Sequence, residues 1–174
     1  VADGAEILDI GGESTRPGHT PVAADEEMRR VVPVIEELSR QTDVPISIDT
    51  SKGVVAVAAV KAGAVIVNDV WGFERDFDVM TDLLRRTGAG AMLMHWREGL
   101  PEDADAAARE IGRYLLERIH LAEEASGLDA LHFMTDPGIG FAKTQEQNLA
   151  IIRYTGYYRE LGYPVLLGPS RKSF

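Results

Sequence analysis

In the stretch LHFMTDPGIGF, residues 131–141, a short apolar run leads directly into a loop that carries a carboxylate and two glycines. A second apolar run, Val165–Leu167, leads in the same way into GPSRKSF at residues 168–174. Such loops follow the carboxyl ends of parallel β-strands, where α/β proteins place their binding and reactive groups. The two stretches therefore predict an α/β fold whose site lies at the strand ends.

Apolar runs rich in β-branched residues recur upstream of these loops. Together with Leu131–Met134 and Val165–Leu167, they predict six strands, the other four being Ile7–Ile10, Ile46–Ile48, Val65–Val67 and Ala91–Met94. The runs are continuous rather than alternating, which is typical of parallel strands that are buried on both faces.

Helical patterns lie between the strands. Residues 24–41 and 103–126 repeat apolar side chains at helical spacing, and Gly127 is a typical stop for the second helix. Pro33 falls inside the first pattern, so we expect a kink or a late helix start there. Alternating strands and helices fit either a barrel or a doubly wound sheet. The barrel is favoured because polar residues follow almost every strand, and only a barrel brings many strand ends together.

The composition limits the classes of partner. Acidic residues outnumber basic ones by 28 to 18, which argues against sequence-independent binding to nucleic acid or to an anionic membrane. The apolar segment at residues 54–67 is too short and too interrupted to span a bilayer. The chain has no cysteine, and His19, His120 and His132 show no ligand spacing, so a zinc site is not expected. We expect a soluble, cytoplasmic protein.

The loop GGESTRPG at residues 11–18 offers backbone amides, hydroxyl groups and the guanidinium of Arg16. This set suits a phosphate or a carboxylate, although such a loop taken alone is more often only a turn. It is neither a dinucleotide-binding fingerprint nor a Walker A loop.

Polar side chains end three of the predicted strands, namely Asp49, Asn68 and Asp136. Each could cap the helix that follows it. Carboxylates gathered in one mouth are costly unless a ligand uses them, so the group as a whole favours a binding site. After the fourth strand, Met94 can line an apolar slot, whereas His95 beside an aromatic residue is more often a packed residue than a general base.

Taken in order, these motifs resemble those of the dihydropteroate synthase family. The resemblance rests on residues 11–18, 48–50, 68–70, 136–141 and 168–174, and it extends over essentially the whole chain. It implies a (β/α)8 TIM barrel that condenses 6-hydroxymethyl-7,8-dihydropterin pyrophosphate with p-aminobenzoate, giving 7,8-dihydropteroate and pyrophosphate. With about six βα units, residues 1–174 are expected to be one incomplete pterin-binding domain, an internal fragment that lacks the first and last strands.

The resemblance also implies residue roles. Asp136 is expected to anchor the pterin, Asn68 and Asp49 to bind its remaining ring nitrogens, and Lys172 to donate to its acceptor edge. Arg16 is expected to bind the pyrophosphate; with Asp49, Asp136 and Lys172 it makes up the expected catalytic set. The p-aminobenzoate slot is expected to contain Thr15, Pro17, Phe141 and Ser173, with Met94, Gly140 and Lys143 as further substrate-binding residues.

The family resemblance further implies Mg²⁺, a homodimer at full length and membership of a family that sulfonamides target. The family's metal-holding Asn and its last-strand Arg-x-His are absent from this sequence, so no metal ligand is assigned here. Two positions depart from the usual pattern, since Ala142 stands where glycine is common and Trp96 where methionine is usual. Alanine would be strained if its position needed a positive φ.

Two other functions stay open at the level of sequence. A methyltetrahydrofolate-dependent methyltransferase domain could share Asp49, Asn68 and Asp136, but it has no evident use for the segment SRKS at residues 170–173. A catalytically silent paralogue that acts as a binding module is the alternative from a different class.

Overall fold

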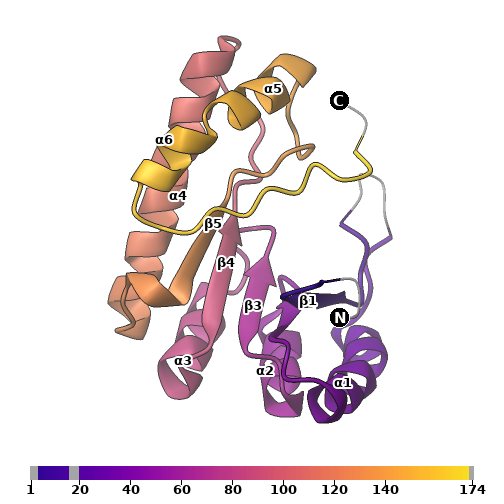
Figure 1. Cartoon of the computed structure of the whole chain (residues 1–174). Coiled ribbons are helices and arrows are strands. Elements are labelled where there is room, and N and C mark those ends of the chain that lie inside the picture. The colour runs from indigo at the N-terminus through magenta and orange to yellow at the C-terminus, as the bar shows by residue number, and fades with distance from the viewer. Residues whose placement is uncertain (1–3, 16–19, 173–174) are drawn as a thin grey trace.

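A computed structural model describes residues 4–15 and 20–172 of the chain. It contains one sheet of five parallel strands that lie in sequence order (Figure 1). The strands are β1 (Leu8–Gly11), β2 (Ile46–Asp49), β3 (Ile66–Asp69), β4 (Gly90–Met94) and β5 (Phe133–Asp136). Strands that are neighbours in both sequence and space, with a helix between each pair, are the repeat from which a (β/α) barrel is built.

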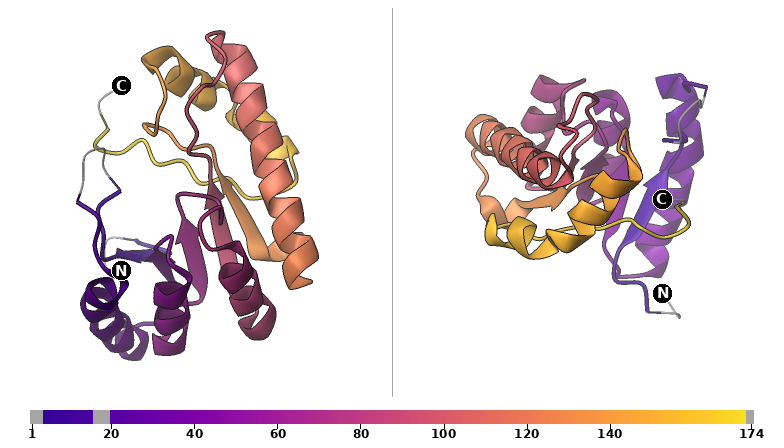
Figure 2. Two further views of the ribbon diagram at one scale, coloured as in Figure 1. Left: turned by 180° about the vertical axis from the view of Figure 1, so that it is seen from behind. Right: turned by 90° about the horizontal axis from the view of Figure 1, so that it is seen from above.

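The helices that link the strands are α1 (Ala24–Gln41), α2 (Gly53–Ala62), α3 (Phe77–Thr87) and α4 (Ala104–Ser126). They pack against one another in order, in a row along the sheet (Figure 2). A 3-10 turn, η1 (Ala130–His132), precedes β5, and α5 (Gln145–Arg153) and α6 (Thr155–Glu160) follow it.

Local sequence signals explain several helix ends. The Asp103 side chain accepts a hydrogen bond from the Ala106 amide at 2.7 Å and begins α4. Gly127, with φ at 73°, ends that helix in the left-handed conformation, as predicted. Helix α1 begins at Ala24 and continues through Pro33, so the expectation of a late start was wrong. The burial of Val31 and Ile35 on either side of Pro33 holds this part of the helix against the sheet.

The predicted sixth strand is reduced to a single bridge. Val165 pairs with Thr135 of β5, supported by a 2.8 Å hydrogen bond from the Leu166 amide to the Thr135 carbonyl. Pro164 has no amide hydrogen and Gly168-Pro169 follows three residues after the bridge begins, which leaves little chain for a ladder. The segment then runs from the edge of β5 towards the carboxyl ends of the strands (yellow in Figure 1).

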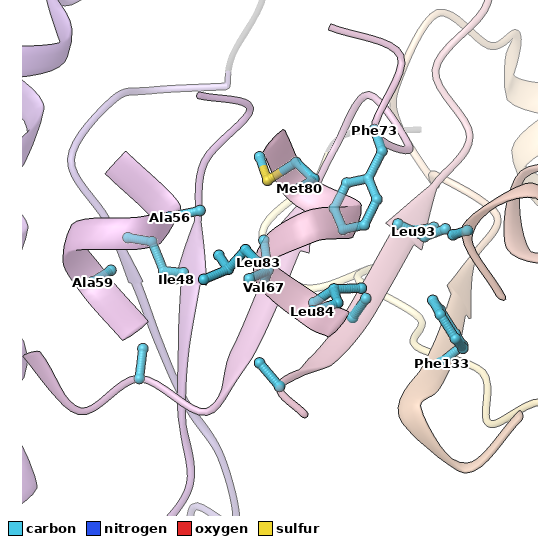
Figure 3. Close-up of a cluster of buried hydrophobic side chains, with 14 of the residues drawn as sticks. Ile48, Ala56, Ala59, Val67, Phe73, Met80, Leu83, Leu84, Leu93 and Phe133 are labelled. Atoms are coloured by element: carbon cyan, nitrogen blue, oxygen red, sulfur yellow. The ribbon is translucent and has the colours of Figure 1, made fainter. Parts of the chain in front are cut away.

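The hydrophobic core lies between the sheet and the helices. Ile48, Val67, Leu93 and Phe133 of successive strands belong to one buried cluster that also contains apolar side chains of α2 and α3 (Figure 3). The prediction of strands buried on both faces is confirmed for β2 to β5, whereas β1 alternates between half-buried and exposed side chains. In this part of the chain β1 is an edge strand with one neighbour, β2.

Candidate functional site

The site is the face of the sheet that points away from the helices. Successive residues of a strand point to opposite faces, so the residues that alternate with the core positions share this second face. On it lie Asp9, Ser47, Asp49, Asn68, Met94 and Asp136. Asp49 is paired in register with Asn68, and Met94 with Asp136, so the predicted pterin residues stand side by side at the carboxyl ends of four strands.

Asp9 is a member of this group that the sequence motifs did not single out. Its carboxylate accepts hydrogen bonds from the Ser47 hydroxyl and, at 3.1 Å, from the Asn68 amide nitrogen. These bonds leave the Asn68 carbonyl oxygen turned away from Asp9. The signal that could have found Asp9 is the period of two within LDIG, which places it on the same face as Asp49.

Asp49 does not cap the helix that follows it. The first amide of α2, that of Gly53, donates instead to the Asp76 carboxylate at 2.7 Å. Burial and the neighbouring carboxylates, Asp9 first among them, raise the pKa of Asp49 to about 7. Asp49 is thus a carboxyl group held among other acids, and among residues 4–15 and 20–172 no hydrogen-bond partner explains its position.

Asp69, by contrast, has the structural role that a strand-end Asp often has. It is fully buried and accepts hydrogen bonds from the amides of Trp71 and Phe73, both at 2.9 Å. Burial raises the pKa of Asp69 to about 6, while these two amides favour its ionised form. Asp69 therefore shapes the loop after β3 and points away from the site face.

Asp136 lies at the end of β5 with only 8% of its surface exposed. It accepts one hydrogen bond, from the Gly138 amide at 2.7 Å. Burial raises its pKa to about 6, and the same amide and the nearby Lys172 and Lys143 oppose that rise. Gly138 is required here, because its φ is 74° and a Cβ would come within 2.2 Å of the His95 carbonyl oxygen.

The two lysines near Asp136 differ. The Lys172 ammonium donates to the Ile139 carbonyl at 2.5 Å and lies 4.2 Å from the centre of the Phe141 ring. Burial lowers its pKa, and Asp136 opposes this. The side chain passes directly over Gly140, where a Cβ would come within 2.8 Å of it. The lack of a side chain at Gly140 thus leaves room for the Lys172 side chain beside the loop.

Lys143 is held by the protein itself. Its ammonium donates to the carbonyl oxygens of Phe141 at 2.9 Å and His95 at 3.1 Å, and it lies 3.2 Å from the His95 ring nitrogen. Burial lowers its pKa to about 7. These contacts join the loops after β4 and β5, so in this structure Lys143 supports the loops of the site rather than facing open space.

His95 is a packed residue. Only 1% of it is exposed, and its ring meets that of Tyr114 edge-on at 4.8 Å. Burial, followed by the positive charge of Lys143, lowers its pKa to about 3, so the imidazole is neutral at pH 7. These contacts fit the interpretation of His95 as a packed residue, and with so low a pKa its imidazole would be a weak base.

The glycine-rich loop is tied down at its base. Lys52 forms ion pairs with Glu13 of this loop and, at 2.5 Å, with the almost fully buried Glu27 of α1. The other oxygen of Glu27 has no hydrogen-bond partner among the described residues. Thr15 and Asp49 line a cavity of about 30 Å³ beside this loop, room for about one water molecule. The remaining predicted residues Arg16, Pro17 and Ser173 lie outside the described residues.

The described residues contain no metal centre built from several acidic or histidine side chains. No group of three or more His, Asp or Glu side chains among residues 4–15 and 20–172 has the arrangement to hold a metal ion.

Ala142, one of the two departures from the family pattern, does adopt a positive φ of 49°. Within the described part of the chain, no helix is long and apolar enough to cross a membrane.

Comparisons with known proteins place this geometry in a family. A family model described as pterin binding enzyme matches residues 1–174. The dihydropteroate synthase of Bacillus subtilis is 47% identical, over 100% of this chain and 60% of its own length. A solved structure of Xanthomonas albilineans dihydropteroate synthase with 4-aminobenzoic acid superposes with a TM-score of 0.90 at 44% identity, covering 98% of this chain and 61% of that one.

A second structure of the Xanthomonas albilineans enzyme, in complex with 7,8-dihydropteroate, gives a TM-score of 0.87 at 40% identity and covers 98% of this chain and 62% of that one. The chain therefore spans about three fifths of the length of these relatives. Because they are TIM barrels, the predicted fold class, an incomplete (β/α)8 barrel, is confirmed.

Proposed function

The chain belongs to the family of pterin-binding enzymes, and from that premise we propose that its activity is that of a dihydropteroate synthase. The reaction joins 6-hydroxymethyl-7,8-dihydropterin pyrophosphate to p-aminobenzoate. The observation that carries the proposal is the row of Asp49, Asn68 and Asp136 on the face of the sheet opposite the core.

Asp136 is suited to anchor the pterin. A carboxylate can accept two parallel N–H bonds from the N3 and 2-amino groups of the ring, and such forked pairs are both strong and specific. From the described part of the chain the buried carboxylate accepts one hydrogen bond, donated by the Gly138 amide, which leaves acceptor positions for a ligand. Asn68 and Asp49 offer an amide and a second carboxyl group to the other ring nitrogens, and Lys172 offers a cation to the carbonyl edge.

The raised pKa values fit this role. Without a ligand, burial lifts the pKa of Asp136 to about 6 and that of Asp49 to about 7. Hydrogen bonds donated by the pterin would favour the ionised form and lower both values. A pocket of this kind rejects an analogue that lacks these donors, because its buried polar atoms would be left unpaired.

In the reaction the C–O bond to pyrophosphate breaks and a C–N bond to the arylamine forms. Pyrophosphate takes the bonding electrons as it leaves, and the amine loses one proton to solvent or to the leaving group. The carboxylates beside the pterin stabilise the positive charge that develops on its methylene carbon. The neutral arylamine is already nucleophilic, so the buried, weakly basic His95 is not needed as a base.

The arylamine slot is proposed at the loops that follow β1 and β5. Phe141 supplies an aromatic wall and Thr15 a hydroxyl, with Pro17 and Ser173 as further members. The similarity to a structure that contains 4-aminobenzoic acid supports this choice of second substrate. Arg16 is proposed to bind the pyrophosphate.

The remaining parts of the proposal come from the family. Magnesium would assist the departure of pyrophosphate, but the described residues do not fit a metal site, and no step above depends on it. We also propose a cytosolic homodimer and, by the likeness of residues 1–174 to one family model, a single pterin-binding domain.

A product assay tests the proposal. The protein expressed from its complete coding sequence is mixed with the pterin pyrophosphate and p-aminobenzoate, and dihydropteroate is measured by chromatography. We expect product that requires both substrates. Methyl transfer from methyltetrahydrofolate in place of this reaction would contradict the proposal, and so would pterin binding without any turnover.

A further inference from the structure

Five side chains form a continuous stack at the carboxyl ends of β3, β4 and β5. The Arg75 guanidinium lies 3.8 Å from the centre of the Trp71 ring, which stacks on Trp96 at 4.3 Å. The centres of the Trp96 and Phe141 rings are 5.2 Å apart, and the Lys172 ammonium lies 4.2 Å from the centre of the Phe141 ring. Three aromatic rings thus follow one another in contact as a column, and a cation lies against the first ring and another against the last.

The column is built from four separate segments. Arg75 and Trp71 belong to the loop after β3, Trp96 to the loop after β4, and Phe141 to the loop after β5, while Lys172 comes from the segment beyond α6. Its base is fixed, because the Trp71 amide donates to the buried Asp69 carboxylate at 2.9 Å. Ring stacking and cation–π contacts then connect each loop of the column to the next, so that each loop helps to hold its neighbour in place.

Trp96 occupies the central place between two parts of the proposed arylamine slot. It contacts Phe141 directly, with the ring planes 56° apart. It also lines the small cavity beside Asp49 together with Thr15, which comes from the other side of the sheet. The Trp96 indole thus contacts Phe141 and shares a cavity lining with Thr15, the two described residues of the proposed slot.

We propose that Trp96 is a positioning residue for the arylamine substrate, acting through Phe141. The inference rests on the proposed function. In the stack, Trp96 and Lys172 both contact the Phe141 ring, and together they restrict how the ring can turn. Without the indole the ring would be free to turn into the vacated space, and p-aminobenzoate would have to restrain it on binding. The loss would therefore fall on arylamine affinity, whereas the pterin contacts of Asp136 and Asn68, which are not members of the column, would be unaffected.

Steady-state kinetics of the protein from the complete coding sequence test this inference. For Trp96→Ala we expect the KM for p-aminobenzoate to rise about tenfold, the size of effect that an aromatic pair gives. The kcat and the affinity for the pterin pyrophosphate should stay within about twofold of wild type. Trp96→Phe, which keeps a ring in the column, should restore most of the arylamine KM.

A control variant shows whether the removal of a large apolar side chain far from the column has the same effect. Leu131→Ala also removes a large apolar side chain, but Leu131 is 90% exposed and lies at the opposite end of β5. Its kinetics should match wild type. The stack itself is tested in the ligand-free protein, where circular dichroism should show coupled indole bands that either Trp71→Phe or Trp96→Phe removes.

The outcomes separate the two claims. If wild type turns over but Trp96→Ala keeps its arylamine KM, the inference is wrong and the proposed function stands. The same holds if Trp96→Ala loses only kcat, or if Trp96→Phe is no better than Trp96→Ala. A wild-type protein that makes no dihydropteroate would overturn the proposed function and this inference together.

Discussion

Three aspartates end neighbouring or nearby strands, and their surroundings give them different roles. Asp69 serves the backbone of its own loop, since two amides donate to it. Asp136 is held by one amide, from Gly138, and Asp49 lies among other carboxylates. Burial raises the pKa of all three, so the pKa direction alone does not identify a ligand-binding group. The hydrogen-bond partners do identify such a group, because a carboxylate whose acceptor positions are already filled has few positions left to accept hydrogen bonds from a ligand.

The pH dependence of stability provides a test of Asp49. Its pKa rises from 3.8 to about 7 on folding, so the folded protein holds this proton across a range in which the unfolded chain releases it. Stability is therefore lost as the pH rises through that range. The Asp49→Asn variant has no ionisable group at this position, so it does not lose stability in this way as the pH rises. The unfolding free energy of the variant should exceed that of wild type by about 1–3 kcal/mol at about pH 8 and by little at about pH 4, allowing for a partly exposed side chain.

Urea denaturation of the ligand-free protein at the two pH values measures this difference. Asp43→Asn, at an exposed position before β2, is the control and should show no such dependence. A stability difference for Asp49→Asn that is the same at both pH values would contradict the assigned burial of its charge. The same variant should also bind the pterin pyrophosphate less well, as expected of a group that is kept for function at a cost in stability.

At the scale of elements, the glycine-rich loop depends on a lysine from a different strand end. Lys52 follows β2, and it joins Glu13 of the loop to Glu27 of α1. The Glu27 side chain is only 1% exposed, whereas that of Lys52 is 28% exposed. Removing the cation would leave a buried carboxylate without compensation, which is costly.

Lys52→Met should therefore lower the unfolding free energy by about 2–4 kcal/mol. The double variant Lys52→Met/Glu27→Met removes both charges and should recover most of that loss, since a buried pair can often be replaced by apolar side chains. Thermal or urea denaturation of the two variants and of Glu27→Met completes the cycle. Single and double variants of equal stability would show that the ion pair does not hold the loop.

Much of this arrangement could be predicted from local patterns. The strand-end positions of Asp49, Asn68 and Asp136 and the course of α4 follow from short-range periodicity and capping signals, which the structure reproduces. A late helix start at Pro33 was the wrong alternative, because tertiary packing of Val31 and Ile35 keeps the residues before it helical.

Contacts between distant loops could not be predicted. The aromatic column joins Trp71, Trp96 and Phe141 across separate loops, and no spacing in the sequence indicates that they meet. The Lys143 ammonium donates to the carbonyls of His95 and Phe141, contacts that no sequence pattern indicates, and its binding of substrate stays a prediction. The position of a lysine in the sequence does not show which oxygens lie within hydrogen-bond distance of its ammonium group.

At the scale of the whole molecule, the described sheet has an open edge at β1. Its side chains alternate between half-buried and exposed, and β2 is its one neighbour within the described residues. Relatives of this chain are longer, with 60% of the Bacillus subtilis enzyme covered by the match. An exposed edge of a parallel sheet tends to pair with other chains.

We therefore predict that a chain limited to residues 1–174 associates and makes no dihydropteroate, whereas the protein extended to the length of its relatives is active. Light scattering and the product assay on the two proteins measure both effects. Turnover by monomeric 174-residue chain equal to that of the longer protein would show that the additional strands are dispensable.

The central claim is that the polar face of the sheet binds a pterin through Asp136, and calorimetric titration with the pterin pyrophosphate tests it most directly. Wild type should bind, and Asp136→Asn should lose about 2–5 kcal/mol of binding free energy, roughly 30-fold in affinity or more, because a buried charge-assisted pair loses one partner. Asp82→Asn, on the outer surface of α3, should bind like wild type. An Asp136→Asn protein that is folded and binds the pterin as tightly as wild type would contradict the claim.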